Sequence, residues 1–320
     1  MKQVLLFTFL FILFSCTKDK KYPEHRSYVN KQIDQFSDTS FFSNIICMQY
    51  YENNLYVLDE LRKDIVTLSK DLDINHVTGK GGPGPEELNI PTKFYVYNDT
   101  TYVLDAGGAY LKSYYKDQFL QSQQLKHLTS NKRFFYNFPN FYLSSVTDHS
   151  IFLVTDLTKE NELSGGELIS FETGKETIMR NGRHLLFDEK YFYAVSDNLP
   201  SIQKYDLKTM ELILDFNLSD IPIIRKNLNH ISLQKDRQNS FYVFIEDAYL
   251  VNESLFLLCA ELGHDYKVNQ LIRIALYPEI AISEIYILPG SLYQSFCVSS
   301  DYIFAFDSQK GTIDRIKLKN

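Results

Sequence analysis

The hydrophobic and polar positions repeat along most of the chain. In each unit a turn precedes a short strand of aromatic or aliphatic residues that often closes in Asp. Six copies occupy residues 55–59, 101–105, 151–156, 191–197, 255–259 and 302–307. Their starts lie 46, 50, 40, 64 and 47 residues apart. A period near 50 with several short strands in each unit predicts a β-propeller.

The second unit shows the pattern most clearly. We expect strands at 92–98, 101–105, 111–116 and 119–125, because each stretch alternates with period two. Tight turns are expected at Asp99-Thr100, at Gly107-Gly108 and at Asp117-Gln118. Four antiparallel strands in about 35 residues make one propeller blade.

The whole pattern predicts an all-β, six-bladed propeller with four-stranded antiparallel blades over residues 27–320. The expected blades are 43–77, 92–125, 141–180, 183–218, 241–288 and 293–319. The last blade has only three strands and would expose an edge. We therefore expect residues 27–33 to supply its fourth strand and close the ring.

The long spacing before the fifth copy indicates an insertion at residues 219–239. This segment is polar, contains Pro222 and lacks clean alternation. It is either a loop with a helical turn or a segment that covers one face. Loops of this length are often functional, and a family-specific decoration is the alternative.

The first sixteen residues resemble the signal of a bacterial lipoprotein. Lys2 is followed by an apolar run at 4–14 that is too short to span a bilayer, and then by Ser15-Cys16. The resemblance implies a signal peptide at 1–15, lipidation of Cys16 and a polar tether at 16–26. It places the protein at the outer membrane, lipid-anchored, facing the periplasm or the cell surface. A plain cleaved signal or a fortuitous apolar start are the alternatives.

Composition narrows the function classes. The chain has 33 Lys and Arg against 40 Asp and Glu, a net charge of -7, and no Trp. An acidic balance argues against a nucleic-acid partner, which needs a basic stripe. Beyond Cys16, the three cysteines at 47, 259 and 297 lie in apolar runs, so buried thiols are expected. A bridge between Cys47 and Cys297 is the alternative.

A Gly-rich segment carries a second resemblance. Residues 79–91 read GKGGPGPEELNIP and lead into the second unit. This segment looks like the linker of NHL-type propellers. Together with the lipobox, the chain resembles six-bladed propeller lipoproteins of the Bacteroides group, which are NHL- or TolB-like. The resemblance implies fold and location more than activity. A phosphate-binding loop is not expected, because the Gly-Lys-Ser/Thr order is missing.

Chemistry-bearing motifs are scarce. The sequence holds no HExxH, CxxC or Gly-x-Ser-x-Gly pattern, so no catalytic residue, cofactor or metal is predicted. The Asp residues that close the repeated strands could form a carboxylate ring. Capping of turns by these side chains is the ordinary alternative.

Two function classes remain. The first is a binding module for a peptide, a glycan or an envelope protein, on the face that carries the loops between blades. The candidate ligand residues on that face are Lys80, Glu86, Glu87 and His264. The second is an envelope hydrolase or lyase with its site at the channel mouth. A cluster of His, Asp and Arg with shifted pKa values on that face would favour the enzyme.

Overall fold

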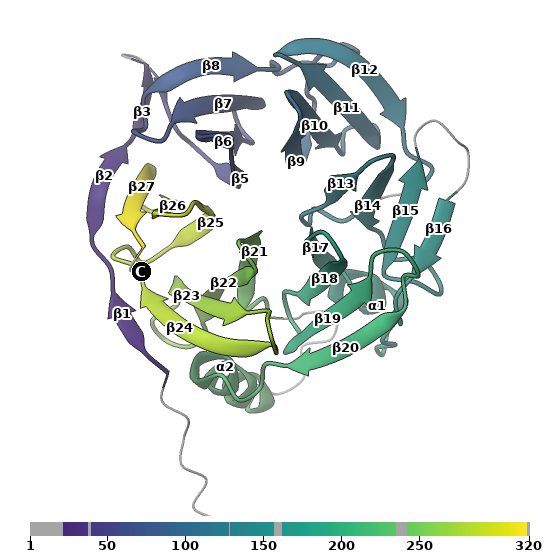
Figure 1. Ribbon diagram of the computed structural model, residues 1–320, viewed down its shortest axis with the longest axis vertical. Helices are drawn as coiled ribbons and strands as arrows, with labels where there is room; N and C mark the ends of the chain where they lie inside the picture. The colour runs from purple at the N-terminus through teal and green to yellow at the C-terminus, as the bar shows by residue number, and fades with distance from the viewer. Residues whose placement is uncertain (1–21, 38–39, 128, 157–161, 235–241, 319–320) are drawn as a thin grey trace, which may run out of the picture.

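Six antiparallel sheets follow one another around a ring in the computed structural model, which confirms the predicted six-bladed propeller (Figure 1). The structure describes residues 22–37, 40–127, 129–156, 162–234 and 242–318. Cys16 and the proposed signal lie outside these residues. In each blade the first strand is innermost, and these six inner strands contact one another in turn around the ring.

The blades have the following strands. Blade 1 holds β5 (Ile45–Tyr51), β6 (Asn54–Asp59), β7 (Asp64–Ser69) and β8 (Ile74–Thr78). Blade 2 holds β9 (Pro91–Tyr97), β10 (Thr100–Asp105), β11 (Tyr110–Tyr115) and β12 (Gln118–Gln124). Blade 3 holds β13 (Phe135–Asn137), β14 (Asn140–Ser144), β15 (Phe152–Asp156) and β16 (Glu162–Gly165). Blade 4 holds β17 (Arg183–Phe187), β18 (Tyr191–Ser196), β19 (Ser201–Asp206) and β20 (Leu212–Asn217).

Blades 5 and 6 are completed by the start of the chain. Blade 5 holds β21 (Ile245–Val251), β22 (Ser254–Glu261), β23 (Lys267–Ala275) and β24 (Ala281–Ile287). Blade 6 holds β25 (Tyr293–Val298), β26 (Tyr302–Asp307) and β27 (Thr312–Lys317). The segment β2 (Val29–Ile33) pairs antiparallel with β27, so the predicted ring closure is confirmed. A short hairpin, β3 (Gln35–Ser37) and β4 (Ser40–Phe41), then leads into blade 1.

The start of the chain also adds a strand that the sequence did not predict. Residues 24–26, assigned to the tether, form β1 (Glu24–Arg26), which pairs in parallel with β24 at the edge of blade 5. Blade 5 therefore has five strands. The polar composition of this segment hid the strand, because a solvent-facing edge strand needs no apolar alternation.

Blade 3 and the turns of blade 2 differ from the prediction in detail. Blade 3 begins at β13, ahead of the expected start at 141, and residues 174–180 form a helix, α1 (Gly174–Arg180). The Thr173 hydroxyl starts this helix by accepting the Glu176 N–H at 3.1 Å. The two-residue hairpin turns of blade 2 fall one residue earlier than expected, because positive φ is taken by Asn98-Asp99 and by Lys116-Asp117. Positive φ at both positions is the type I′ geometry that matches strand twist.

The insertion forms a helix, α2 (Pro222–Ser232), at the rim of the ring beside blade 5 (Figure 1). Ile223, Ile224 and Asn227 are its buried residues. The Asn227 amide donates to the Ala260 carbonyl at 2.7 Å and accepts the Leu262 N–H at 2.9 Å. These two bonds hold the helix against the end of β22. Residues 235–239 of the predicted insertion lie outside the described residues. Neither helix in the described chain has the length and apolarity to cross a membrane.

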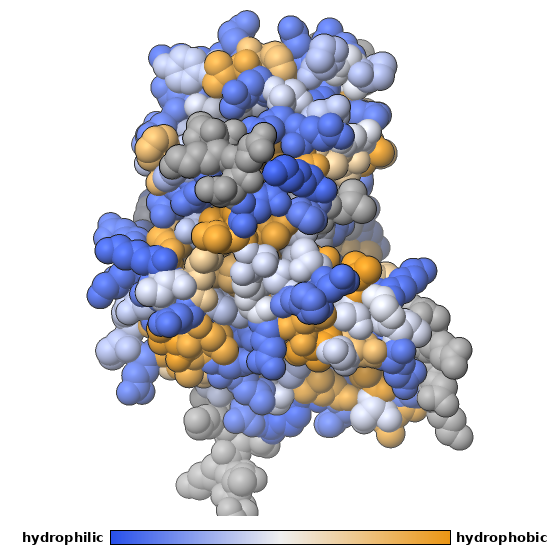
Figure 2. All heavy atoms as spheres, turned by 90° about the vertical axis from the view of Figure 1, so that its right-hand side faces the viewer, coloured by the Kyte–Doolittle hydropathy of each residue, from blue (hydrophilic) through white to orange (hydrophobic). Residues whose placement is uncertain are grey.

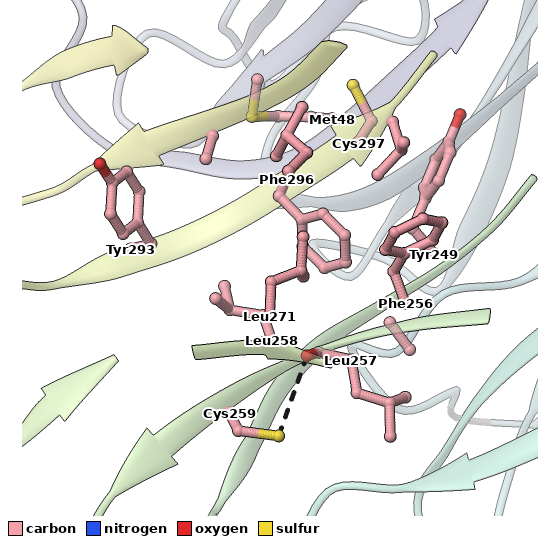
Figure 3. Close-up of a cluster of buried hydrophobic side chains, with 14 of the residues drawn as sticks. Met48, Tyr249, Phe256, Leu257, Leu258, Cys259, Leu271, Tyr293, Phe296 and Cys297 are labelled. Carbon is pink, nitrogen blue, oxygen red and sulfur yellow. Dashed lines mark hydrogen bonds between the residues drawn. The ribbon is translucent and has the colours of Figure 1, made fainter. Parts of the chain in front are cut away.

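The core lies between neighbouring blades. Figure 3 shows Phe296 of blade 6 facing Leu258 and Leu271 of blade 5, with Met48 of blade 1 nearby, and all four side chains are fully buried. Cys47, Cys259 and Cys297 are buried and unpaired, as the main prediction had it, and the alternative Cys47–Cys297 bridge is absent. On the face shown in Figure 2, hydrophilic side chains lie between several separate groups of apolar ones.

Three of the Asp residues that close the repeated strands, Asp59, Asp105 and Asp307, cap turns, as the ordinary alternative predicted. Asp197 instead bonds the side chains of Lys132 and Asn198. Asp59 accepts N–H bonds from Ser43 and Leu61. Asp105 accepts those of Asn89 at 3.0 Å and Ile90 at 2.7 Å, and it pairs with the buried Lys112 at 2.9 Å. The carboxylates of Asp59 and Asp105 thus fix the segments that lead into the inner strands of their own blades.

This arrangement predicts an acid-dependent loss of stability. Burial acts to raise the pKa of Asp105, but the two N–H donors and Lys112 outweigh it, so the pKa lies below its ordinary value. The stabilisation is therefore complete above the unfolded pKa of about 3.9 and is lost as the pH falls through the lower folded value. We expect Asp105→Ala to lower the free energy of unfolding by about 3 kcal/mol at neutral pH, because Lys112 stays buried without its partner. The difference in free energy of unfolding between Asp105→Ala and wild type should become smaller below about pH 4.

The measurement is urea unfolding of both proteins between neutral pH and about pH 3. Asp99→Asn on the same blade is the control, because Asp99 and its partner Lys116 are both exposed and Asn keeps the positive φ of this turn. The control variant should lower the free energy of unfolding by less than about 1 kcal/mol at every pH. An Asp105→Ala protein as stable as this control would contradict the capping role.

Candidate functional site

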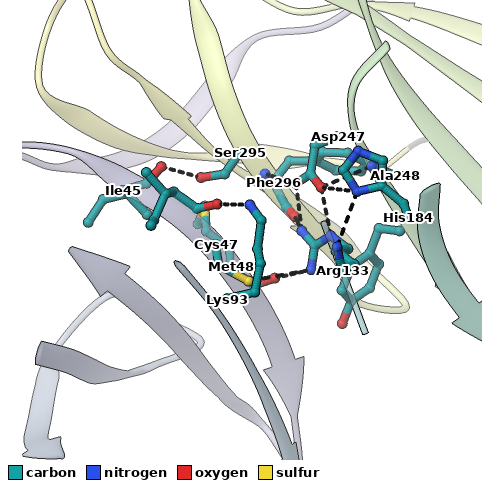
Figure 4. Close-up of polar contacts among 12 residues, drawn as sticks. Ile45, Cys47, Met48, Lys93, Arg133, His184, Asp247, Ala248, Ser295 and Phe296 are labelled. Atoms are coloured by element: carbon teal, nitrogen blue, oxygen red, sulfur yellow. Dashed lines mark hydrogen bonds and ion pairs between the residues drawn. The ribbon is translucent and has the colours of Figure 1, made fainter. Parts of the chain in front are cut away.

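A buried ion pair joins four blades at the centre of the ring. Arg133, just ahead of β13, makes two bonds of 2.6 Å to Asp247 of β21 (Figure 4). The guanidinium also donates to the carbonyl of Met48 at 2.9 Å, to that of Phe296 at 2.8 Å and to the Cys47 sulfur at 3.9 Å. All five N–H donors of Arg133 are therefore used. The pair holds the inner strands of blades 1, 5 and 6 to the start of blade 3.

A cavity of about 300 Å³ lies beside this pair, at the end of the ring where the inner strands begin. This is the face of the loops between blades that the sequence analysis singled out. We call the cavity the polar mouth, and it is lined by Ile46, Glu60, Thr92, Lys93, Asn131, Lys132, His184, Val243, Glu246 and Gln294. Its volume is at the lower end for ligand pockets, so it suits a small group or the end of a longer ligand.

Two lysines supply positive charge to the polar mouth. Lys93 of β9 is buried, and its ammonium donates to the Ile46 carbonyl. Within the described chain no carboxylate lies within ion-pair distance of Lys93. Burial lowers the pKa of Lys93, and the charges of Arg133 and Lys132 act in the same direction. Lys132 is partly exposed and pairs with Asp197, one of the repeated strand-end carboxylates.

His184 of β17 supplies a hydrogen-bond donor. Its side chain is buried, and Nδ1 accepts the main-chain N–H of Arg133 at 3.5 Å (Figure 4). Burial and the nearby lysines hold the pKa of His184 well below its ordinary value, so the ring is neutral at physiological pH. With Nδ1 accepting, the proton lies on Nε2. Among the described residues Nε2 has no hydrogen-bond partner, which is a costly state for a buried polar atom.

Carboxylates complete the lining. Burial raises the pKa of Glu246, although the Tyr266 hydroxyl, which donates to it at 2.9 Å, acts against this shift. Glu60 accepts the Asn44 amide at 2.6 Å. The polar mouth therefore combines two ammonium groups, one neutral imidazole donor, two carboxylates and the amides of Asn131 and Gln294. In the part of the chain that the structure describes, no three His, Cys, Asp or Glu side chains are placed to hold a metal ion.

The residues predicted for the ligand face lie on the same face of the ring as the polar mouth, but outside its lining. The Glu87 carboxylate accepts the Gly84 N–H at 2.9 Å and pairs with Lys80 at 3.0 Å, so it stabilises the loop in which it lies. The main chain of Glu86 accepts the Tyr114 hydroxyl at 2.8 Å. His264 is fully exposed beside Asp265, in blade 5 on the other side of the ring. The structure brings Lys80 and Glu87 together, but not with His264.

The polar mouth was missed because its side chains stand singly in different blades. Lys93, His184 and Asp247 each interrupt an apolar inner strand, and this is the signal that could have found them. A charged residue within a strand that is buried on both faces must have a partner from another blade. Only the ring closure brings these side chains together, and no spacing along the chain encodes it.

Comparisons with known proteins add support for the fold. No family model matches the chain, and no curated protein matches it. A Bacteroides fragilis protein described as exported aligns over 88% of this chain and 87% of its own, with 18% identity and a TM-score of 0.58. A DUF4221-family member from Bacteroides vulgatus aligns over 92% and 98%, with 13% identity and a TM-score of 0.57. Virginiamycin B lyase from Staphylococcus aureus aligns over 90% and 99%, with 11% identity and a TM-score of 0.52. At these identities the likeness concerns the fold alone.

Proposed function

We propose that the protein is a lipid-anchored binding module of the cell envelope whose polar mouth holds the carboxylate end of a peptide-like ligand. The observation that carries the proposal is that Lys93 and His184 line the same cavity. Lys93 is a buried ammonium without a carboxylate partner in the described chain, and His184 has an unused Nε2 donor. A bound carboxylate would satisfy both groups.

The mixed lining supports a peptide-like ligand. Lys132 would add a second cation near the carboxylate, while Glu246 and the amides of Asn131 and Gln294 could bond main-chain N–H and C=O groups. A site that bound its ligand by charge alone would carry charges of one sign, whereas the polar mouth carries both signs. The C-terminal carboxylate of an envelope protein has the same chemistry as that of a short peptide, so such a protein would be a ligand of the same class.

Binding is favoured over catalysis because the charged groups at the centre of the ring are already engaged in hydrogen bonds. Arg133 and Asp247 bond each other, and no N–H of Arg133 remains for a reacting oxygen. Burial holds the pKa of His184 well below its ordinary value, which makes the neutral ring a weaker base than an ordinary histidine. The one mouth hydroxyl, that of Thr92, donates to the Leu104 carbonyl rather than to a base.

The envelope location rests on two supports. Residues 1–16 follow the pattern of a lipoprotein signal ending in Cys16. A structural neighbour of similar length is described as exported. Mass spectrometry of the membrane-extracted protein tests the anchor, because acylation of Cys16 adds a defined mass to the first peptide.

The ligand class is tested by a thermal-shift screen of the purified protein. The panel holds short peptides with free C-termini, the same peptides as C-terminal amides, neutral and acidic oligosaccharides, nucleotides and divalent metals. A ligand at 100 times its Kd should add about 2.7 kcal/mol of apparent stability. We expect the free-acid peptides to stabilise the protein and their amides to have little effect. A response to neutral oligosaccharides instead would replace the peptide with a glycan.

One observation favours the alternative that the protein is a lyase or hydrolase. Lys93 has a lowered pKa, and such lysines can act as bases or nucleophiles. Each stabilising ligand is therefore incubated with the protein and analysed by mass spectrometry. An unchanged ligand supports binding, whereas conversion that Lys93→Met abolishes would support the enzyme.

A further inference from the structure

A second cavity, of about 210 Å³, lies at the opposite end of the inner strands. Gln49 and Tyr50 at the end of β5, Tyr95 of β9, Phe187 of β17 and Tyr249 of β21 contribute to its lining. We call it the aromatic mouth. The Arg133 guanidinium lines it, and the same Arg133 bonds His184 of the polar mouth through its main chain. The central ion pair therefore lies between the two cavities.

The walls of the aromatic mouth are rings held in fixed positions. Phe135 stacks on Phe187 with a centroid distance of 4.4 Å, and Tyr95 lies at 6.4 Å from Phe187. The Tyr249 hydroxyl accepts the Tyr50 N–H at 3.1 Å and donates to the Tyr50 carbonyl at 3.2 Å. A ligand would meet these rings without first having to order them, which favours binding.

The polar groups of this cavity are already hydrogen-bonded, with two exceptions. The Gln49 amide exchanges two bonds with the main chain of Val96, at 3.0 and 2.8 Å. Arg133 has no N–H left, and the Tyr249 hydroxyl bonds the main chain of Tyr50. Among the residues that the structure describes, the hydroxyls of Tyr50 and Tyr95 have no hydrogen-bond partner. The Tyr50 ring stacks on Phe304 of blade 6 at 5.5 Å, whereas the Tyr95 ring lies beside Phe187 of the cavity wall. A ligand would therefore find apolar walls and the free hydroxyl of Tyr95.

We infer that the aromatic mouth binds a planar, uncharged aromatic group that carries one N–H or O–H, of the indole or phenol class. An engineered apolar cavity of about 150 Å³ holds benzene, so this one has room for a slightly larger ring. Rings at these positions favour stacked or edge-on contacts with a planar guest. A charged guest is disfavoured, because no unpaired charge remains here to offset its desolvation. This inference does not depend on the function proposed for the polar mouth.

The absence of Trp from the chain allows a direct experiment. The purified protein is titrated into a fixed, low concentration of indole, which is excited on the red edge of tyrosine absorption so that the emission comes from indole alone. We expect a blue shift that saturates as the protein concentration rises, because the bound ring leaves water. Indole emission that stays unshifted up to millimolar protein would overturn the proposal, as would a shift that never saturates.

Three variants locate the site. Val251→Phe fills the cavity from the end of β21 and should weaken indole binding at least about tenfold. Tyr95→Phe keeps the ring and removes the hydroxyl, so it should weaken indole about fivefold and leave toluene, followed by thermal shift, unchanged. Lys226→Ala, at an exposed lysine of α2, is the control and should bind indole as wild type does. Thermal unfolding shows whether Val251→Phe is folded; if it is not, Tyr95→Phe decides alone. Indole binding that Tyr95→Phe leaves unchanged, or that Lys226→Ala weakens equally, would contradict the assignment.

Discussion

Replacing Arg133 with Met is expected to lower the free energy of unfolding by about 3–5 kcal/mol, the usual cost of removing one partner of a buried ion pair. The variant leaves Asp247, which is 1% exposed, as an uncompensated charge. It also removes the donors that hold the carbonyls of Met48 and Phe296, so two acceptors from other blades lose their partners. Because these contacts span four blades, the loss affects the whole ring rather than one sheet.

The comparison that isolates the charge is the double variant Arg133→Met/Asp247→Leu. Removing both charges should recover a substantial part of the lost free energy of unfolding. A buried ion pair often stabilises a protein no more than apolar residues of similar size would. Arg225→Met is the control, since Arg225 and its partner Asp220 are exposed. It should change stability by less than about 1 kcal/mol. Urea unfolding of the four proteins measures these differences. An Arg133→Met protein as stable as the control would disprove the central role of the pair.

Removing the start of the chain up to residue 33 is expected to have the second large effect. The strand β2 makes four registered pairs with β27, each worth about 1 kcal/mol, and Ile33 packs against the core. Arg315 of β27 also reaches Asn30 at 2.7 Å and the carbonyl of Lys70 at 2.9 Å, which joins blade 6 to blade 1. Without β2 the ring would expose the edge of β27 to pairing with other chains.

The matched truncation ends at residue 26 and removes β1 but keeps β2. We expect it to keep the association state of the wild type and nearly normal stability, because β1 has three residues on the outer edge of blade 5. The longer truncation should lose at least about 4 kcal/mol and associate. Size-exclusion chromatography and thermal unfolding distinguish the two. Equal behaviour of the two proteins would mean that β2 does not close the ring.

The local pattern was enough to predict the blades and the closing strand, because each blade is built from contacts within about 50 residues. The alternation of residues 101–105 and the missing fourth strand of blade 6 both follow from strand geometry. The turn positions in blade 2 were wrong by one residue, because positive φ falls on Asn98-Asp99 and Lys116-Asp117. Asn and Asp adopt positive φ more readily than other residues with side chains, whereas the β-branched Thr100 does not, and this preference was overlooked.

The site could not be predicted in the same way. Lys80, Glu86, Glu87 and His264 were chosen for exposure and charge on the loops, and the structure shows Glu87 engaged with its own loop. The polar mouth instead depends on Lys93, Lys132 and His184, which come from three positions separated by up to 91 residues. Their proximity is a property of the closed ring. The NHL-like and lipoprotein resemblances stay predictions.

The most direct measurement of the central claim is a pair of dissociation constants. An acetylated tripeptide and its C-terminal amide are titrated by calorimetry into wild type and into Lys93→Met, with Lys226→Met, a surface lysine of α2, as the control. We predict that wild type and the control bind the free acid at least about tenfold more tightly than the amide, and that Lys93→Met binds the two equally. Equal affinity of wild type for acid and amide, or an unchanged preference in Lys93→Met, would contradict the carboxylate site at the polar mouth.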